Sequence, residues 1–423
     1  MRRFVFEEQE LDCDQVRVFV RLKFGWLSWV VKIFRIEFIS QKMTLRVTCE
    51  KGNFKELSVI IEIHPHSVDA CEMIEKVEFL VLMPFMFRAY QERLSEQKMK
   101  AFFAYRQETI KKDLDVFDQY LTQDRKKILV SGANGLIGRD LVAFLRGMGH
   151  QVYVLTRKKE AGDTVFYDDK TGEIDQAKLE GFDTVIHLRG QSVFCRWSKR
   201  KKNEIIRSRV ESTKKLAHHL ALLSHPPKTF LCASAVGYYG GRGEEVLQEK
   251  SSCGSGFFLS ELTQEWEQAT QILVRKNIRV VHLRFGIVLT MRGGALPKIV
   301  TPIKYGLAGS FGEGQHWQSW ITLDDAVGAI SHCIFHEQIA GPVNIVSPNP
   351  IRNRDLTSEI ASYYGKQPGP KVPTFMVRLF AGQMGEELLL SSTRVIPAVL
   401  LQTGFRFRYP TIQDALHRLL RPV

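Results

Sequence analysis

The stretch that decides the fold is residues 126–138, which read KKILVSGANGLIG. A short apolar run leads into three glycines, Gly132, Gly135 and Gly138, and an amphipathic segment follows them. This order predicts a buried strand, a tight turn and a helix, and residues 151–155 (QVYVL) supply the next strand. Glycines at this spacing let the backbone approach a pyrophosphate, which then lies on the positive end of the helix. The stretch therefore predicts a dinucleotide site, with a glycine turn that holds no ligand as the alternative.

The position of this turn predicts a separate module in front of it. Residues 1–125 precede the turn, and a length of 423 residues is enough for two or three domains. We expect a front domain at residues 1–122 and a nucleotide-binding domain at residues 126–350.

Composition limits the class of protein. The whole net charge of +13 lies in residues 126–423, which suits an anionic cofactor. Nucleic acid or an acidic membrane surface would also suit it, but no nucleic-acid-binding motif accompanies the charge. Charged residues interrupt the apolar stretch at residues 26–38, so we expect no membrane span. The seven dispersed cysteines have no metal-binding spacing and are typical of free thiols in a reducing cytoplasm, so we expect no metal and a cytoplasmic protein.

The front module shows the pattern of a half-buried sheet followed by a helix. Strict alternation at residues 16–24 (VRVFVRLKF) predicts an antiparallel strand, and similar runs recur at residues 45–50, 58–64 and 76–82. Apolar residues near helical spacing over residues 99–117 predict a long helix. Such an α+β helix-grip fold often encloses an apolar cavity, so we expect an apolar ligand there. Residues 99–108 (MKAFFAYRQE) resemble the last helix of START-like domains of the polyketide cyclase/dehydrase type.

The end of the second strand indicates which dinucleotide is bound. The strand ends in Thr156, Arg157 and Lys158, where an NAD site usually has a carboxylate for the ribose hydroxyls. A carboxylate would repel a 2′-phosphate, whereas arginine would hold it. Arg157 therefore predicts NADP(H), and a solvated basic turn is the alternative.

Further strands complete the pattern of an α/β fold. Apolar runs at residues 183–188, 229–234 and 278–283 alternate with segments of helical character. This alternation predicts a doubly wound parallel sheet of the Rossmann type. The strand at residues 183–188 should lie beside the first strand.

Residues 126–423 resemble the extended short-chain dehydrogenase/reductase superfamily. Within it, they resemble the sugar-epimerase-like subfamily known as the cell-division-inhibitor or SulA type, in which a START-like front module also occurs. Residues 373–423 resemble the small helical domain that closes this subfamily. The segments that carry the resemblance are 196–198 (RWS), 207–213 (RSRVEST), 234–240 (SAVGYYG), 266–267 (WE), 293–295 (GGA), 319–321 (SWI), 341–344 (GPVN), 348–350 (PNP) and 394–397 (RVIP).

The resemblance implies a set of cofactor contacts at the glycine turn, at the ends of the next two strands and in the helix after them. The implied residues are Gly132, Asn134, Gly135, Leu136, Ile137, Gly138, Thr156, Arg157, Leu188, Arg189, Glu204 and Arg209.

The superfamily usually works with a tyrosine, a lysine four residues later, and a serine or threonine that binds the substrate oxygen. Ser234 is the candidate for the last role, with a serine that only caps the strand end as the alternative. Aligned on the WE segment, the tyrosine and lysine positions hold Phe258 and Leu262, which cannot exchange a proton. Tyr238 is a candidate replacement, whereas we expect Tyr239 to be packed.

The candidate substrate wall is residues 312–320 (GEGQHWQSW). Gln315, His316 and Trp317 are its candidate contacts, although the subfamily tends to have arginine and glutamine at the first two positions. Asp324 and Asp325 follow, and we expect this pair to cap the next helix.

These observations predict an NADP(H)-binding, epimerase-like oxidoreductase whose substrate is unknown, with a nucleotide sugar as one candidate. Because the Tyr/Lys pair is missing, its catalytic activity is uncertain. The alternative is a non-catalytic NADP(H)-binding regulator or scaffold, connected with cell division.

Overall fold

The structure is a computed structural model of the 423-residue chain. It describes the backbone of residues 6–11, 15–24, 27–39, 44–51, 54–65, 71–81, 85–120, 123–158, 162–168 and 171–420, and continuous side-chain detail begins at Phe103. By its internal contacts the chain divides into two units, residues 1–108 and residues 109–421. Gly52 and Asn53, and His66 after Pro65, are residues that favour turns between the predicted strands, and these three positions lie outside the described residues.

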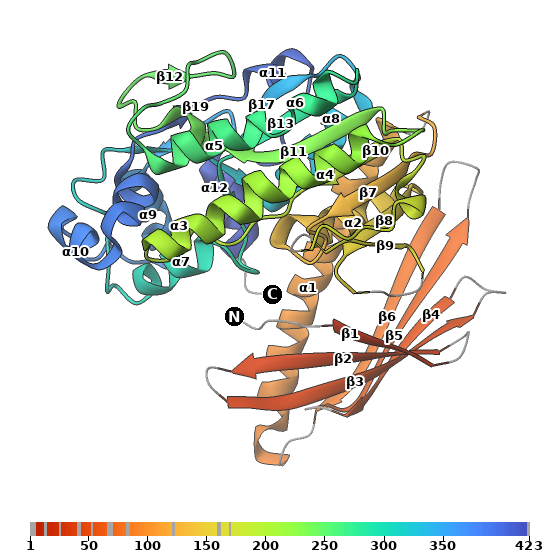
Figure 1. The fold of residues 1–423 in the computed structure, drawn as a ribbon. Helices are drawn as coiled ribbons and strands as arrows, with labels where there is room; N and C mark the ends of the chain where they lie inside the picture. The colour runs from red at the N-terminus through yellow and green to blue at the C-terminus, as the bar shows by residue number, and fades with distance from the viewer. Residues whose placement is uncertain are drawn as a thin grey trace. The chain divides into compact units, whose positions relative to one another are not determined.

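The front unit contains a six-stranded sheet in which each strand pairs with the next along the chain, antiparallel throughout (Figure 1). The alternation at residues 16–24 becomes β2, and the three other predicted strands become β4, β5 and β6. Sequence reasoning missed the first and third strands. The strands are β1 (Phe6–Leu11), β2 (Gln15–Phe24), β3 (Leu27–Ile39), β4 (Thr44–Lys51), β5 (Phe54–Pro65) and β6 (Cys71–Val81).

A long helix, α1 (Phe85–Asp118), follows this sheet as predicted. We expected the front domain to extend to residue 122, but the division into units falls within α1. The reason is that the end of the helix packs into the second unit. Phe117 meets Phe144 with ring centroids 5.0 Å apart, and Tyr120 stacks on Phe335 at 4.6 Å.

The second unit is built on a seven-stranded parallel sheet with the order β17-β13-β11-β10-β7-β8-β9. The chain reverses its direction of progress between β7 and β10, as in the Rossmann fold, and ligands bind at such a switch point. The strands are β7 (Lys127–Ser131), β8 (Gln151–Thr156), β9 (Thr164–Phe166), β10 (Thr184–His187), β11 (Thr229–Ala235), β13 (Arg279–Phe285) and β17 (Gly341–Ile345).

Helices cover both faces of this sheet because alternate strand residues point to opposite faces. On one face, Ile128 and Val130 of β7 pack under α2 and α8. On the other, Leu129 packs under α4, α5 and α6. The doubly wound architecture is therefore confirmed (Figure 1). The helices are α2 (Leu136–Gly147), α3 (Lys199–Ile206), α4 (Ser212–Ala221), α5 (Phe258–Gln268), α6 (Gln271–Val274), α7 (Leu296–Lys304), α8 (Leu323–Phe335) and α9 (Asn353–Tyr363).

The C-terminal segment is mostly helical and packs within the second unit. It contains α10 (Thr374–Gly385), the π-helical turn η5 (Glu386–Leu390), α11 (Ala398–Gln402) and α12 (Ile412–Leu420). The helical path of α10 breaks at Gly382, where φ is +57°. The short strands are β12 (Val246–Leu247), β14 (Ile287–Leu289), β15 (Trp317–Gln318), β16 (Trp320–Thr322), β18 (Ile351–Arg352) and β19 (Arg394–Val395).

Candidate functional site

The glycine turn lies at the carboxyl end of β7, at the switch point of the sheet. Gly132 has a φ of +83°, and a Cβ there would lie 2.9 Å from the Leu188 carbonyl carbon. A Cβ at Gly138 would lie 2.8 Å from the Gly132 carbonyl carbon and closer still to its oxygen. Gly135 caps α2, and no described side chain accepts from the first amides of that helix. The turn is therefore a close-packed backbone cradle in front of an open helix N-terminus, which is the arrangement that a pyrophosphate needs.

The other residues implied as cofactor contacts in this region lie in the turn, at the start of α2 and in the loop after β10. Asn134 is exposed, and Leu136 and Ile137 are half-buried at the start of α2. The backbone amide of Leu188 donates to the Ser131 carbonyl over 3.0 Å, which ties the loop after β10 to the turn. A Cβ at Gly132 would also lie 3.1 Å from the Arg189 nitrogen.

Two arginines lie on loops that border this turn. Arg157 follows Thr156 at the end of β8 and is exposed. The last residue pair between β7 and β8 is Ser131 and Leu155, so Arg157 and the glycine turn follow neighbouring strand ends. Arg209, in the π-helical turn η3 (Arg207–Glu211), donates to the Gln191 carbonyl over 2.7 Å. Burial lowers the pKa of Arg209 to about 10. Arg209 is half-buried, and its guanidinium lies 5.3 Å from the centre of the Trp266 ring. Among the described residues no carboxylate pairs with Arg209, so its charge has no counter-charge there.

Glu204 lies on α3. Its carboxylate accepts from Lys201 Nζ over 2.5 Å and from Arg200 Nε over 3.1 Å, both on the same helix. Ser198 is the N-cap of this helix, and its hydroxyl accepts from the Lys201 amide.

Ser234, at the end of β11, takes part in a buried ion pair. Its hydroxyl donates to Glu267 Oε1 over 2.7 Å. Arg284 Nε and Nη2 donate to the two oxygens of the same carboxylate, both over 2.8 Å, and the Arg284 side chain is 3% exposed. Burial opposes the charge of Arg284, but its bonds to Glu267 outweigh this effect and raise its pKa. The Ser234 hydroxyl is therefore committed to a structural partner and does not point to an open site.

The two tyrosines after β11 have different surroundings. Tyr239 is fully buried, donates to Asn344 Oδ1 over 2.7 Å and accepts from Arg284 Nη1 over 3.0 Å. Burial raises the pKa of Tyr239 to about 12. The packed role expected for Tyr239 is thus confirmed. Tyr238 is half-buried, with the Arg284 guanidinium 3.5 Å above its ring, and no described group bonds to its hydroxyl.

The positions of the missing Tyr/Lys pair have become packing positions. The Phe258 ring lies edge-on to Trp197 with centroids 5.0 Å apart, and Lys202 Nζ lies 4.8 Å from the Phe258 ring centre. Leu262 is 2% exposed. Proton exchange at these positions is therefore excluded by their side chains and by their surroundings.

Glu387 of the C-terminal segment caps the N-terminus of α5, the helix that begins at Phe258. Glu387 accepts from the backbone amides of Phe258 and Leu259, both over 2.9 Å. These amides open α5, which has no cap from its own side chains. A carboxylate is stabilised at such a helix start, so Glu387 fixes the C-terminal segment against α5.

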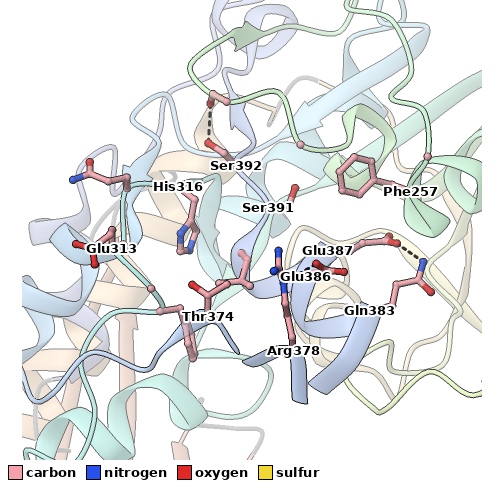
Figure 2. Close-up of a pocket in the computed structure, with 18 residues that line it drawn as sticks. Phe257, Glu313, His316, Thr374, Arg378, Gln383, Glu386, Glu387, Ser391 and Ser392 are labelled. Carbon is pink, nitrogen blue, oxygen red and sulfur yellow. Dashed lines mark hydrogen bonds and ion pairs between the residues drawn. The ribbon is translucent and has the colours of Figure 1, made fainter. Parts of the chain in front are cut away.

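A cavity of about 960 Å³ opens between three segments of the second unit: the loops around Gly241 and Phe257, the loop at residues 311–316, and the C-terminal segment between residues 374 and 392. Figure 2 shows Phe257 on one side of this cavity and His316 on the other, with Arg378, Glu386 and Ser391 between them. Residues 312–316 of the predicted substrate wall therefore line a cavity, whereas residues 317–320 are not among its lining residues.

The three candidate wall residues have different roles. His316 lines the cavity; its Nε2 is shielded from water and has no described partner. Gln315 accepts from Arg352 Nη1 with its carbonyl (2.8 Å) and with Oε1 (2.9 Å). Trp317 is covered by two guanidinium groups, those of Arg352 and Arg394, 4.7 and 4.4 Å from the ring centre. Its ring therefore packs against these arginines.

The acidic pair after β16 is structural in a way that the sequence did not predict. Thr322, not an aspartate, caps α8 by accepting from the Asp325 amide over 3.1 Å. Asp325 accepts from the backbone amides of Arg408 (2.7 Å) and Tyr409 (3.1 Å). Burial raises the pKa of Asp325 to about 6.

Sequence reasoning missed Arg378, Glu386, Glu387 and Ser391 as lining residues. The only signal was an acidic pair directly after Gly385 in a basic region, and nothing local says that this pair faces a cavity. In the part of the chain that the structure describes, no helix is long and apolar enough to cross a membrane, and no group of three or more His, Cys, Asp or Glu residues could hold a metal ion.

Comparison with known proteins identifies the fold and the family. Residues 128–345 match the NAD dependent epimerase/dehydratase family, and residues 372–419 match a domain of unknown function (DUF1731). The epimerase family protein YfhF of Bacillus subtilis is 32% identical over 297 residues, which cover 69% of this chain and 97% of that protein. The chloroplastic SDR39U1 homolog of Arabidopsis thaliana is 32% identical and covers 71% of this chain and 88% of that protein.

Two solved structures are similar as well. A nucleoside-diphosphate sugar epimerase from Corynebacterium glutamicum has 29% identity and a TM-score of 0.77, over 96% of this chain and 80% of that chain. Human epimerase family protein SDR39U1 (isoform 2), solved with NADPH, has 28% identity and a TM-score of 0.65, over 70% of this chain and 99% of that chain. The sheet order, the glycine turn and these matches together show that the chain belongs to the NAD dependent epimerase/dehydratase family.

Proposed function

We propose that this chain is an NADP(H)-binding, epimerase-like oxidoreductase of the extended short-chain dehydrogenase/reductase type. The observation that carries the proposal is the half-buried Arg209, which has no carboxylate partner among the described residues and lies against the loop that touches the glycine turn. A Cβ at Gly190, next to Arg189, would lie 3.1 Å from the Arg209 guanidinium carbon. A partly desolvated cation without a counter-charge favours the binding of an anion.

The residues present fit the cofactor. The turn at Gly132–Gly138 and the start of α2 would hold the pyrophosphate, and the Arg209 guanidinium would neutralise it. Arg157, exposed at the end of β8, would hold the 2′-phosphate. Bound NADP(H) would supply or accept a hydride. The human relative solved with NADPH supports this assignment.

Proton transfer must then come from a group other than the Tyr/Lys pair. Of the two hydroxyls proposed from the sequence, Tyr238 has no described hydrogen-bond partner, whereas Ser234 donates to Glu267. We therefore assign the proton donor to Tyr238 and give Ser234 a positioning role, because it links β11 to the ion pair beneath Tyr238.

The packing of Phe258 and Leu262 supports a second candidate, a non-catalytic NADP(H)-binding regulator or scaffold, including one connected with cell division. Such a protein would bind the cofactor fully and transfer no hydride. A nucleotide sugar stays a candidate substrate only through the names of relatives such as the Corynebacterium glutamicum epimerase.

For the front unit, we propose a START-like domain that holds an apolar ligand. The support is the succession of an antiparallel sheet and one long helix. A cytoplasmic location is proposed from the dispersed cysteines alone. Native mass spectrometry of the purified full chain, with identification of released molecules, tests the apolar ligand.

The decisive test of the cofactor is the Arg157→Ala variant. Isothermal titration calorimetry should show that NADPH affinity falls about tenfold or more while NADH affinity changes little, because a hydrogen bond to a charged group is worth about 1.5–3 kcal/mol. Arg275→Ala is the matched control, since Arg275 is exposed and precedes β13, which lies on the far side of β7 from β8 in the sheet. Equal losses for both nucleotides would refute the phosphate contact.

Turnover separates the two candidate functions. NADPH oxidation with a panel of carbonyl compounds should be measurable in the wild type, strongly reduced in Tyr238→Phe, and retained in a folded Ser234→Ala variant. Full NADPH occupancy without oxidation of any compound would favour the regulator.

A further inference from the structure

The cavity beside His316 has a distinctive set of charges. Among the described residues that line it, Arg378 is the single lysine or arginine, and its Nε lies 2.9 Å from Glu386 Oε1. Glu313 pairs with Lys371 Nζ over 2.6 Å. Glu387 accepts from the first amides of α5. The lining therefore has three carboxylates and one guanidinium, each with a partner of its own.

This arrangement is unsuited to a diphosphate. Proteins hold phosphate groups with arginine or lysine side chains or with the free amides of a helix N-terminus. Glu386 already neutralises Arg378, and Glu387 already occupies the N-terminus of α5. A nucleoside diphosphate would therefore meet three carboxylates and no uncommitted cation.

The groups that lack partners in the cavity are neutral. The hydroxyls of Thr374 and Ser391 make no hydrogen bond to the described residues, whereas the neighbouring Ser392 donates to the Gly243 carbonyl. His316 Nε2 is shielded from water, and burial lowers the pKa of His316, which disfavours its cationic form, so the ring brings no free cation to the cavity. The two hydroxyls can both donate and accept. Phe257 adds an aromatic face, against which the C–H groups of a sugar ring can pack (Figure 2).

We propose that this cavity binds an uncharged polyhydroxylated compound of the sugar or sugar-alcohol class and excludes nucleoside diphosphate sugars. The inference rests on the proposed oxidoreductase function, for which such a compound is the substrate. In the reduction direction, a hydride would add to the carbonyl carbon of the open-chain sugar and a proton would go to its oxygen, so that an alcohol and oxidised cofactor result.

Saturation-transfer difference NMR on the full-length protein, with saturating NADPH, tests the proposal. The probes are methyl α-D-glucopyranoside and UDP-glucose, which share the glucose ring and differ in charge. Ser391→Trp fills the cavity, and Ser358→Trp, at an exposed position of α9, is the matched control. The saturation signal of the glucoside should be lost in Ser391→Trp and kept in Ser358→Trp. UDP-glucose should give no signal that depends on position 391.

A double variant and its control test the proposal without a bulky substitution. Glu313→Gln/Glu386→Gln frees Arg378 and removes two carboxylates, so UDP-glucose should gain a saturation signal that is lost again when Ser391→Trp is added. Glu337→Gln, exposed at the end of α8, should change nothing. A wild-type UDP-glucose signal that is lost in Ser391→Trp would overturn the proposal, as would the absence of any glucoside signal. If the wild-type protein binds the glucoside but does not bind NADPH, the proposed oxidoreductase function is refuted and the proposed sugar site is not.

Discussion

The ion pair between Glu267 and Arg284 allows a demanding test of how this site is held together. Both side chains are shielded from water, with exposed fractions of 12% for Glu267 and 3% for Arg284, and two hydrogen bonds of 2.8 Å join them. Glu267→Gln keeps the shape of the side chain and removes the negative charge, so the Arg284 cation is left buried. Breaking one partner of a buried pair costs about 3–5 kcal/mol, and we expect that loss in the free energy of unfolding.

The assay is urea unfolding of the full chain, followed by the fluorescence of the buried Trp266 and Trp320. Glu265→Gln is the control, because Glu265 lies on the same helix and is exposed. This control should change the free energy of unfolding by no more than about 0.5 kcal/mol. In the double variant Glu267→Gln/Arg284→Met much of the loss should be recovered, since a buried pair replaced by apolar groups is often near neutral.

If Glu267→Gln lowers the free energy of unfolding by less than about 1 kcal/mol, the reasoning is refuted, because such a small loss is typical of solvent-exposed salt bridges. A double variant less stable than Glu267→Gln alone would also refute it. Because Arg284 packs on Tyr238 and bonds Tyr239, the same variant should weaken any hydride transfer that depends on Tyr238.

Two further predictions concern the cradle and the core. Gly138→Ala places a methyl group against the Gly132 carbonyl, so NADPH affinity measured by calorimetry should fall at least about tenfold, a loss of about 1.4 kcal/mol. Gly328→Ala, whose Cβ would lie 3.4 Å from Phe405, should bind normally, and equal affinities in both variants would contradict the model of the turn. His187 is fully buried without described partners at either ring nitrogen, and burial lowers its pKa to about 3. Because the folded pKa lies below the unfolded value of about 6.5, its stabilising contribution is complete above pH 6.5 and falls as pH drops toward 3, by about 2 kcal/mol between pH 8 and pH 5. His187→Leu should reduce the loss of unfolding free energy over this range by that amount, and an unchanged pH dependence would contradict the assignment.

Local residue patterns were sufficient to predict most of the strands and the glycine turn from the sequence. The glycine turn, the five predicted strands of the parallel sheet and the alternating strands of the front unit are set by residue type and spacing over a few positions. Sequence reasoning missed β1 and β3 of the front unit and β9 and β17 of the parallel sheet. Charged residues interrupt the apolar run of β3, and β9 spans only Thr164–Phe166. The packed state of Tyr239 also followed from the sequence, because a bulky aromatic at the end of a buried strand has little room to be exposed.

The sequence by itself determined the fold class, the cofactor cradle and the loss of the Tyr/Lys pair, because each depends on the identity of residues at fixed short spacing. Only the tertiary structure decided what those residues contact. It brings Glu387 to the start of α5 across 129 positions of sequence, commits Ser234 to Glu267, and covers Trp317 with Arg352 and Arg394. A side chain has the same chemistry wherever it lies, but hydrogen bonds and ion pairs act over only a few ångströms. The partners that convert an acidic pair into a helix cap, or a serine into a support, are therefore set by how distant segments pack.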